Sequence, residues 1–132
     1  MTTLTEEHMR HAAEQYAIRL TSGDAAAVAA LFAPEAVIED PVGSAPKVGH
    51  ETILAFYTGA IDRAHPTLTV TGPVRTVPAA ATAAMPFRSE SFFDNRHVTI
   101  DIIDVFTFDD EGRITSMKAY FGPANIHSVE GM

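Results

Sequence analysis

The chain has 132 residues, of which 46% are apolar and 20% are charged, and it contains no cysteine. This length fits one domain over residues 1–132, and the composition is that of an ordinary globular protein. The formal net charge of −8, with scattered basic residues, argues against nucleic acid or an anionic membrane as a partner. The lack of cysteine excludes disulfides, thiolate nucleophiles and cysteine-bound zinc.

The amino-terminal segment, residues 1–10, is polar and carries two glutamates, so the sequence predicts neither a signal peptide nor a membrane anchor. No apolar stretch approaches the roughly 20 residues that a membrane-spanning helix needs. We therefore expect a cytoplasmic domain that does not associate with membranes.

Helical patterns dominate the first half of the chain. Thr3 and Glu6 have the spacing of a capping box, and a helix from there to Gly23 would place one apolar stripe inward. That stripe consists of Met9, Ala12, Ala13, Tyr16, Ala17 and Leu20. Asp24 offers an N-cap for a short helix that continues through Phe32 and is stopped by Pro34. A third helix is expected to carry Ile53, Phe56, Tyr57 and Ile61.

Strand patterns follow, after an early strand at 36–40 that Pro41 ends. Alternating apolar residues predict further strands at 67–71, 74–77, 84–93, 98–108 and 114–121. The segment 109–112 is a hairpin turn, and the tail after Gly122 is expected to be loosely ordered. Helices first and strands later predict an α+β fold, with a curved, mainly antiparallel sheet covered on one face by helices.

Asp104 is the most unusual residue of these strands. Alternation places it on the same face as Ile100, Ile102, Phe106 and Phe108, whereas Asp101 lies on the opposite, mixed face. A carboxylate among such neighbours is unfavourable unless it is paired, and remaining protonated avoids that penalty. Either Asp104 forms an ion pair with Arg75, Arg88 or Arg113, or sits at a bulge, or it is a neutral acid that can donate a hydrogen bond.

Three other sets of polar residues have ordinary and functional explanations. Tyr16 is the one polar-tipped residue on the inward stripe of the first helix, where most tyrosines bond to the backbone. Asp40 shares a strand face with Ile38 and precedes Pro41, which would hold its carboxylate at an apolar pocket, although Asp-Pro is also a common turn. His8 and His11 lie off the stripe without a convincing third ligand, so no metal site is expected.

Taken together, Tyr16, Asp40 with Pro41, and Asp104 resemble in order and spacing the bacterial ketosteroid isomerases of the nuclear-transport-factor-2-like (NTF2-like, SnoaL-like) superfamily. The similarity covers nearly the whole chain, through the segments 37–41, 55–57, 71–75, 84–88, 101–105 and 112–114. It implies an NTF2-like cone, a curved sheet with three N-terminal helices packed on its concave face.

The resemblance also implies an activity, a steroid Δ5-isomerase that converts 3-oxo-Δ5-steroids to 3-oxo-Δ4-steroids. That family uses an aspartate base and an oxyanion hole made of a tyrosine and a protonated aspartic acid. Asp40 would be the base, and Tyr16 and Asp104 the donors. The implied substrate-binding residues are Leu20, Phe56, Tyr57, Met85, Phe87, Ile100, Ile102, Met117 and Phe121, with Tyr57 also a partner of Tyr16.

No metal or organic cofactor is implied. The expected partners are an apolar small-molecule ketone, a 3-oxo-steroid, and a second copy of the chain in a homodimer formed through the outer face of the late strands. Two positions depart from some family members, because Phe32 stands where they carry a tyrosine and Phe121 where they carry a tryptophan. The first shortens the chain of hydroxyls behind Tyr16, the second alters the shape of the pocket, and neither touches the three central residues.

Two alternatives remain open at this point. One is a different enzyme on the same cone, such as a cyclase, dehydratase or epoxide hydrolase, since one fold hosts many activities. An enzyme that acts through water needs a further polar group to hold that water. The other alternative is a non-catalytic module that binds an apolar ligand or a partner protein.

Overall fold

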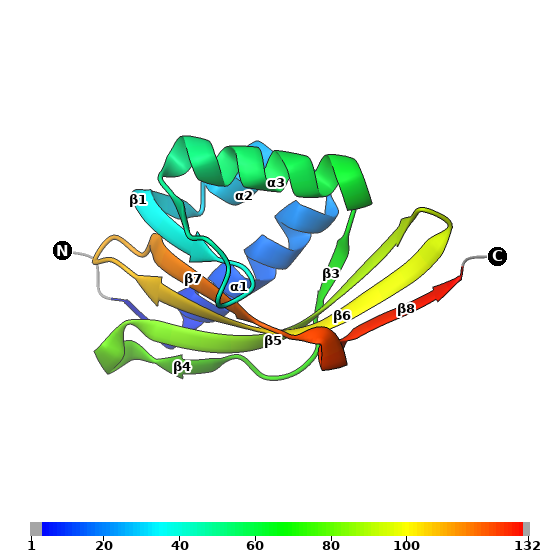
Figure 1. Ribbon diagram of the computed structural model, residues 1–132. Coiled ribbons are helices and arrows are strands. Elements are labelled where there is room, and N and C mark those ends of the chain that lie inside the picture. Colours follow the sequence, from blue (N-terminus) through cyan, green and yellow to red (C-terminus); the bar gives the residue numbers. More distant parts are fainter. Residues whose placement is uncertain (1–3, 131–132) are drawn as a thin grey trace.

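The computed structural model describes residues 4–130 as a strongly curved sheet with three α-helices on its concave side (Figure 1). The helices are α1 (Glu6–Thr21), α2 (Ala25–Ala29) and α3 (His50–Ala64). The strands are β1 (Phe32–Glu39), β2 (Lys47–Val48), β3 (Thr67–Val70), β4 (Arg75–Val77), β5 (Thr82–Phe93), β6 (Arg96–Phe108), β7 (Ile114–Tyr120) and β8 (Ile126–Glu130). The predicted α+β cone is confirmed.

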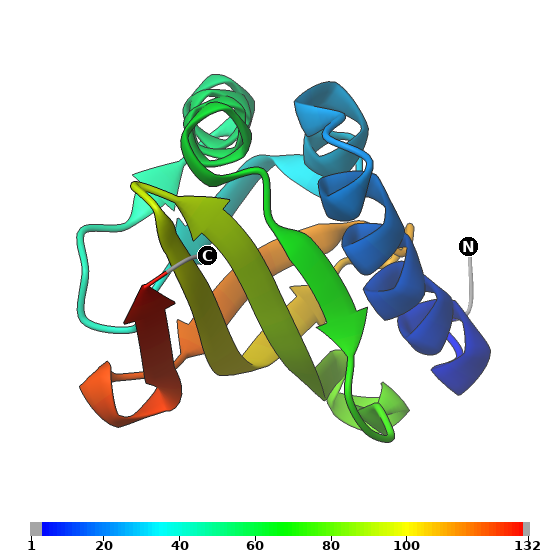
Figure 2. The ribbon, with the colours of Figure 1, turned by 90° about the vertical axis from the view of Figure 1, so that its right-hand side faces the viewer.

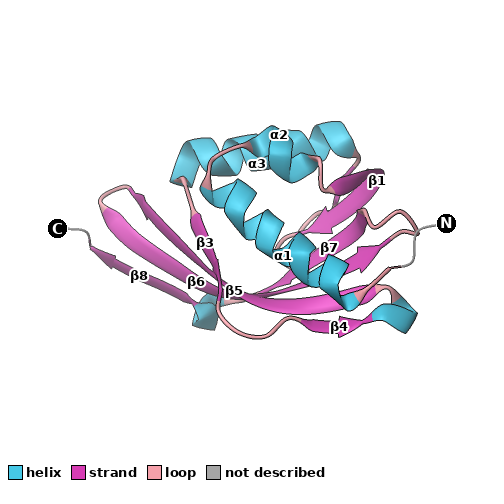
Figure 3. Ribbon diagram, turned by 180° about the vertical axis from the view of Figure 1, so that it is seen from behind, coloured by secondary structure: helices cyan, strands magenta, loops and turns pink. Residues whose placement is uncertain are grey.

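The sheet has the order β2-β1-β7-β6-β5-β3, with β4 also on β5 and β8 also on β6. Its pairs are antiparallel except for β1 with β7. The long strands β5 and β6 run through the whole sheet, and their hairpin extends past the helices (Figures 1 and 3). In the part of the chain that the structure describes, no helix is long and apolar enough to cross a membrane.

Helix α1 lies across the sheet with its predicted stripe buried. Its N-cap is Thr5, whose side chain accepts a hydrogen bond from the backbone N–H of His8 at 3.0 Å. The predicted capping residue Thr3 lies outside the described residues. Its predicted partner Glu6 is the first helical residue, so the capping-box spacing was wrong. The helix ends at Thr21, shortly before Gly23, as expected, and Figure 2 shows it beside β3, which it contacts.

The expected extension of the second helix to Phe32 was wrong, because α2 ends at Ala29 and Phe32 already opens β1. Asp24 does cap α2, accepting a hydrogen bond from the Ala27 N–H at 3.0 Å. Pro34 lies inside β1, in the stretch where the register with β7 shifts. A proline there removes no ladder hydrogen bond, which is why it is tolerated within a strand.

The tail after Gly122 is not loosely ordered over its described part, because residues 126–130 form β8 on the outer half of β6. The physical reason is an open strand edge. On that side of β6, β7 pairs with residues 103–108 only, so residues 96–100 have free backbone groups that β8 satisfies. The hairpin turn at 109–112 is as predicted, with Asp109 Oδ1 accepting from the N–H groups of Glu111 and Arg113, both at 2.9 Å.

Candidate active site

A cavity of about 260 Å³ lies between the helices and the concave face of the sheet. It is lined by Tyr16, Leu20, Asp40, Phe56, Tyr57, Ala60, Arg63, Ala64, Pro66, Leu68, Ser89, Ser91, Phe93, Val98, Ile100, Ile102, Asp104 and Phe121. The structure therefore brings Tyr16, Asp40 and Asp104 to one mostly apolar cavity. Concave apolar sites with a few polar groups are where proteins bind small molecules.

Asp104 faces this cavity from the middle of β6, opposite Met85 of β5 and Ala119 of β7. Its side chain is only 3% exposed, and within residues 4–130 its Oδ1 has no hydrogen-bond partner. Burial, and after it the charge of Asp40, raise the pKa of Asp104 well above its usual range. A shift in this direction favours the protonated carboxylic acid, which can donate a hydrogen bond.

The arginines that could have paired with Asp104 are engaged elsewhere. Arg88 forms an ion pair with Asp101 at 3.0 Å, on the outer face of the strands. Arg113 pairs with Asp109 at 3.1 Å, and Arg75 donates to the carbonyl oxygen of Pro73 at 2.7 Å. The ion-paired alternative for Asp104 is therefore wrong.

Tyr16 enters the cavity from α1, with its ring packed against Phe87 and Phe106 at centroid distances of 5.7 and 5.5 Å. Its hydroxyl oxygen lies 2.8 Å from that of Tyr57 on α3, so its partner is a side chain and not the backbone. Burial, followed by the neighbouring Tyr57, Asp104 and Asp40, raises the pKa of Tyr16 well above its usual value. Tyr16 is thus a second neutral donor.

Asp40 follows β1 directly, and two hydrogen bonds hold the chain just after it in place. The Val42 N–H donates to the carbonyl oxygen of Ala119 at 2.8 Å, and the Gly43 N–H donates to Glu39 Oε1 at 2.7 Å. Burial raises the pKa of Asp40 to about 6, and the cation of Lys47 opposes this rise. Burial thus raises the pKa of both carboxyl groups of this cavity, and at Asp40 the cation of Lys47 favours the ionised form.

The cavity wall differs in part from the expected one. Six of the expected residues line it, namely Leu20, Phe56, Tyr57, Ile100, Ile102 and Phe121. Met85, Phe87 and Met117 do not, because they are fully buried in the core. The sulfur of Met117 accepts a hydrogen bond from the Tyr57 hydroxyl at 3.7 Å, so this side chain lies behind the polar cluster.

Several lining residues were missed, although the sequence carried a signal for them. Ser89, Ser91 and Phe93 continue the alternation of Met85 and Phe87 along β5, and Val98 continues that of Ile100 along β6. On α3, Ala60 and Ala64 follow Phe56 at four-residue intervals. These spacings place them on the inward faces of their elements.

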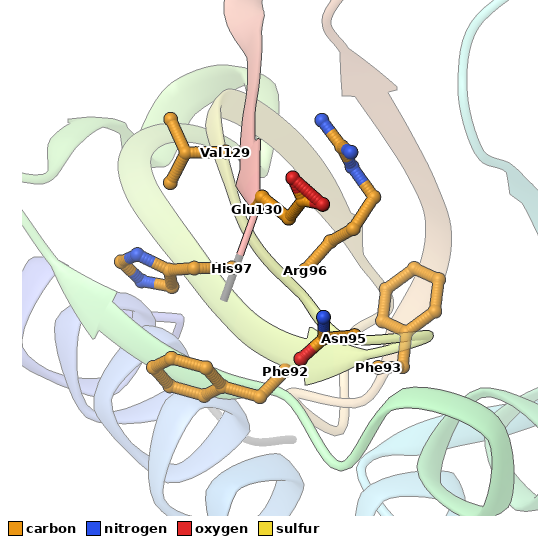
Figure 4. A pocket seen from close by; sticks show the side chains of 7 residues that line it. All are labelled: Phe92, Phe93, Asn95, Arg96, His97, Val129 and Glu130. Carbon is orange, nitrogen blue, oxygen red and sulfur yellow. The ribbon is translucent and has the colours of Figure 1, made fainter. Parts of the chain in front are cut away.

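Two other features do not form a competing centre. A hollow at the tip of the β5–β6 hairpin is lined by Phe92, Phe93, Asn95, Arg96, His97, Val129 and Glu130 (Figure 4). There Arg96 binds Ser128 Oγ at 2.6 Å and His97 pairs with Glu90 at 2.6 Å. His8 contacts the carbonyl oxygen of Gly112 at 2.7 Å, and no cluster of potential metal ligands occurs among the described residues.

This arrangement is suited to proton transfer next to an oxygen that gains charge. Asp40, with a pKa near neutrality, can accept a proton and return it. Tyr16 and Asp104 can donate hydrogen bonds to an oxyanion in this mostly apolar cavity. The Tyr57 hydroxyl supports Tyr16 from behind.

Comparisons with known proteins agree with the fold. Residues 12–117 match the model of the SnoaL-like domain. Steroid Delta-isomerase of Nocardioides simplex is 37% identical over 118 residues, covering 89% of this chain and 93% of that protein. Epoxide hydrolase LasB of Streptomyces lasalocidi is 25% identical over 144 aligned positions, which cover 95% of this chain and 51% of LasB.

Among solved structures, the epoxide hydrolase/cyclase-like enzyme SalBIII, described for its role in pyran ring formation in polyether salinomycin, superposes with a TM-score of 0.86. It is 25% identical, and the match covers 94% of this chain and 98% of SalBIII. These relatives are enzymes, and one of them is an isomerase. With a domain match over most of its length and a relative of this similarity, the chain belongs to the SnoaL-like (NTF2-like) family.

Proposed function

We propose that this protein is a steroid Δ5-isomerase, which converts a 3-oxo-Δ5-steroid to its conjugated 3-oxo-Δ4 isomer. Asp40 acts as the base, and Tyr16 and Asp104 form the oxyanion hole. The similarity to Steroid Delta-isomerase supports the choice of reaction. The observation that carries the proposal is the cavity that brings Asp40 together with a buried Asp104 whose Oδ1 has no hydrogen-bond partner among the described residues.

In the first step the Asp40 carboxylate removes a proton from the carbon between the ketone and the double bond. The electron pair of that C–H bond moves toward the ketone oxygen, which gives a dienolate and a protonated Asp40. In the second step Asp40 returns the same proton to the far end of the dienolate, and the double bond then lies in conjugation with the ketone. The proposed reaction consumes no co-reactant, because one carboxyl group accepts and returns the proton.

The oxyanion hole supplies most of the required stabilisation. A proton next to a ketone is a weak acid, and a carboxylate is a weak base, so the first step is steeply uphill in water. Each donor directed at a developing oxyanion is worth about 2.7–4 kcal/mol in a site that excludes water. A protonated carboxyl and a phenol provide two such donors without the penalty of burying a further cation.

One assay tests the proposal directly. Conjugation of a Δ5-3-ketone changes its ultraviolet absorbance, so the parent protein and Asp40→Asn can be followed on the same substrate. We expect turnover by the parent and a loss of several orders of magnitude in kcat for Asp40→Asn, with an unchanged circular dichroism spectrum. Equal rates for the two proteins would remove Asp40 as the base. Binding of the steroid without turnover by the parent would indicate a binding module.

Epoxide opening is the second candidate, favoured by the similarity to LasB and SalBIII. A protonated Asp104 could donate to the epoxide oxygen while Asp40 removes a proton from water or from a hydroxyl of the substrate. Ser89 and Ser91 are polar groups of the cavity that could hold such a water. Hydrolysis or cyclisation of an epoxide, with no isomerisation of the Δ5-ketone, would favour this function over the first.

We also propose that two copies of the chain associate through the outer face of β6 and β7. Ile103 and Tyr120 are register partners there and are 44% and 47% exposed, so together they form an exposed apolar patch on this face. A second copy would cover this apolar patch. Light scattering should give a dimer mass for the parent and a monomer mass for Ile103→Glu.

A further inference from the structure

The cavity has a second polar region besides the one around Tyr16 and Asp104. Arg63 and Ser91 line it together with Pro66, Phe93 and Val98. Arg63 lies in the last turn of α3, Pro66 directly precedes β3, and the other three residues belong to the β5–β6 hairpin. Figures 1 and 2 show that these three segments lie at the same end of the molecule. This region is the mouth of the cavity, since Arg63 is exposed whereas Tyr16 and Asp104 are almost fully buried.

Arg63 is a cation without a partner in the described part of the chain. No hydrogen bond or ion pair of its guanidinium occurs within residues 4–130, whereas Arg88, Arg96 and Arg113 are each bound to side chains. Arg10 is also without a partner among these residues, but it does not line the cavity, whereas Arg63 does. Its place at the end of α3 suits the helix dipole, but that does not account for its lining a cavity.

Ser91 provides an independent observation. It is 7% exposed, it lines the cavity, and within residues 4–130 its hydroxyl makes no hydrogen bond. Ser89, two residues earlier on the same strand face, also lines the cavity. Among the described residues the one fully enclosed side-chain polar atom without a partner is Asp104 Oδ1, so the Ser91 hydroxyl reaches the accessible space of the cavity, where it can bind a ligand. A ligand with an oxygen-bearing substituent at this end would satisfy it.

We propose that Arg63 and Ser91 form a subsite for a carboxylate on the substrate, at the end remote from the reacting ketone. Guanidinium groups bind carboxylates with two parallel hydrogen bonds, and a serine hydroxyl adds a third donor. This inference rests on the proposed function, since it places the ketone of a steroid at Tyr16 and Asp104. Ring D then points to the mouth, so the substrate class is a 3-oxo-steroid with an acidic side chain at C17.

Two ligands of nearly the same shape test this inference by calorimetry. One is a 3-oxo-Δ4-steroid with a 17β-carboxylate, and the other has an uncharged 17β-acetyl group. We expect Arg63→Met to weaken binding of the carboxylate about fivefold and binding of the acetyl ligand less than twofold. Ser91→Ala should also weaken binding of the carboxylate ligand. Added salt should weaken binding of the carboxylate ligand to the parent protein, and it should weaken binding to Arg63→Met much less.

Arg10→Met is the matched control, because Arg10 is an exposed cation of α1 that does not line the cavity. It should leave both affinities unchanged. The inference is overturned if Arg63→Met weakens both ligands equally, if it leaves the carboxylate affinity unchanged, or if Arg10→Met has the same effect. Failure of the proposed function has a different signature, namely the expected affinity ratios with no isomerisation of the corresponding Δ5-ketone.

Discussion

The hydroxyl oxygens of Tyr16 and Tyr57 lie 2.8 Å apart, and the Tyr57 hydroxyl donates in turn to the sulfur of Met117 at 3.7 Å. Tyr57 has a single hydroxyl proton. While it donates this proton in the hydrogen bond to Met117, its oxygen can only accept a hydrogen bond from the Tyr16 hydroxyl. A substrate oxygen near Tyr16 would compete for the proton of Tyr16. Because thioether sulfur is a weak acceptor, Tyr57 can then turn and donate to Tyr16 instead. The pair thus offers Tyr16 an alternative partner when the cavity is empty.

The first prediction separates these two tyrosines. Tyr16→Phe removes a donor to the oxyanion and should lower kcat roughly 10²–10³-fold. Tyr57→Phe removes only the group behind that donor, so kcat should fall less than tenfold with little change in KM. Steady-state kinetics on the Δ5-ketone measure both effects. A larger loss for Tyr57→Phe than for Tyr16→Phe would reverse the two roles.

The second prediction concerns the dependence of the rate on pH. Asp40 must be ionised to accept a proton, and its pKa is raised by burial to about 6. We therefore expect kcat/KM to fall tenfold per pH unit well below pH 6 and to level off above pH 7. A profile that is flat from pH 5 to pH 8 would contradict this assignment.

The third prediction uses the same group as a probe of stability. The pKa of Asp40 is raised in the folded state, so between its unfolded value of 3.8 and about 6 the folded protein binds more protons than the unfolded chain. The contribution of this group to stability is therefore complete below about pH 4 and is lost as the pH rises through 6. Urea denaturation should show a smaller decline over this interval in Asp40→Asn than in the parent. Identical slopes would place Asp40 in a solvated environment.

The fourth prediction compares two replacements of Asp104. Asparagine keeps a neutral group with N–H donors, whereas alanine removes the donor and leaves a space in the wall of the cavity. Asp104→Asn should therefore retain more kcat than Asp104→Ala, and it should be at least as stable as the parent at pH 7. In the parent, the carboxyl carbon of Asp104 should titrate in NMR far above the reference value of about 3.9. Titration near that reference value would show that Asp104 is not a neutral donor.

The fifth prediction tests the turn between β6 and β7. Gly112 has φ +82°, and a Cβ atom there would lie 2.5 Å from His8 Nε2. Gly112→Ala should lower the free energy of unfolding by about 1–2 kcal/mol through backbone strain, and it should displace the His8 ring. Gly122→Ala is the matched control, since Gly122 has φ −135° and a Cβ atom added to it would meet nothing within 4 Å. Equal melting temperatures for all three proteins would contradict the prediction.

The sequence alone was sufficient to predict the fold class and to identify which residues of β6 face inward. The change from helical spacing to alternation predicted helices before strands, and alternation alone placed Asp104 on the apolar face. It could not reveal β8, because all five residues of that strand are exposed and its formation depends on a free edge of β6. Such an edge arises only once distant strands have paired.

The sequence also could not predict how far the cavity extends along the strands. Phe87 and Ser91 lie on the same face of β5, yet Phe87 is buried in the core and Ser91 faces the cavity. The difference depends on where the helices cross the sheet, with Phe87 beneath the ring of Tyr16 on α1. Alternation identifies a face, but it does not tell how far along the strand that face is covered. Arg63 was missed because it lies at the end of its helix, outside the apolar stripe.

The change of partner along β6 has a consequence for how such a protein can evolve. Asp104 lies in the half of β6 that pairs with β7, whereas Val98 lies in the half that pairs with β8. Substitutions or insertions in the hairpin or in β8 can therefore remodel the entrance while the reacting groups keep their places. Selection can therefore change which ligands enter the cavity while the residues around Asp104 stay the same.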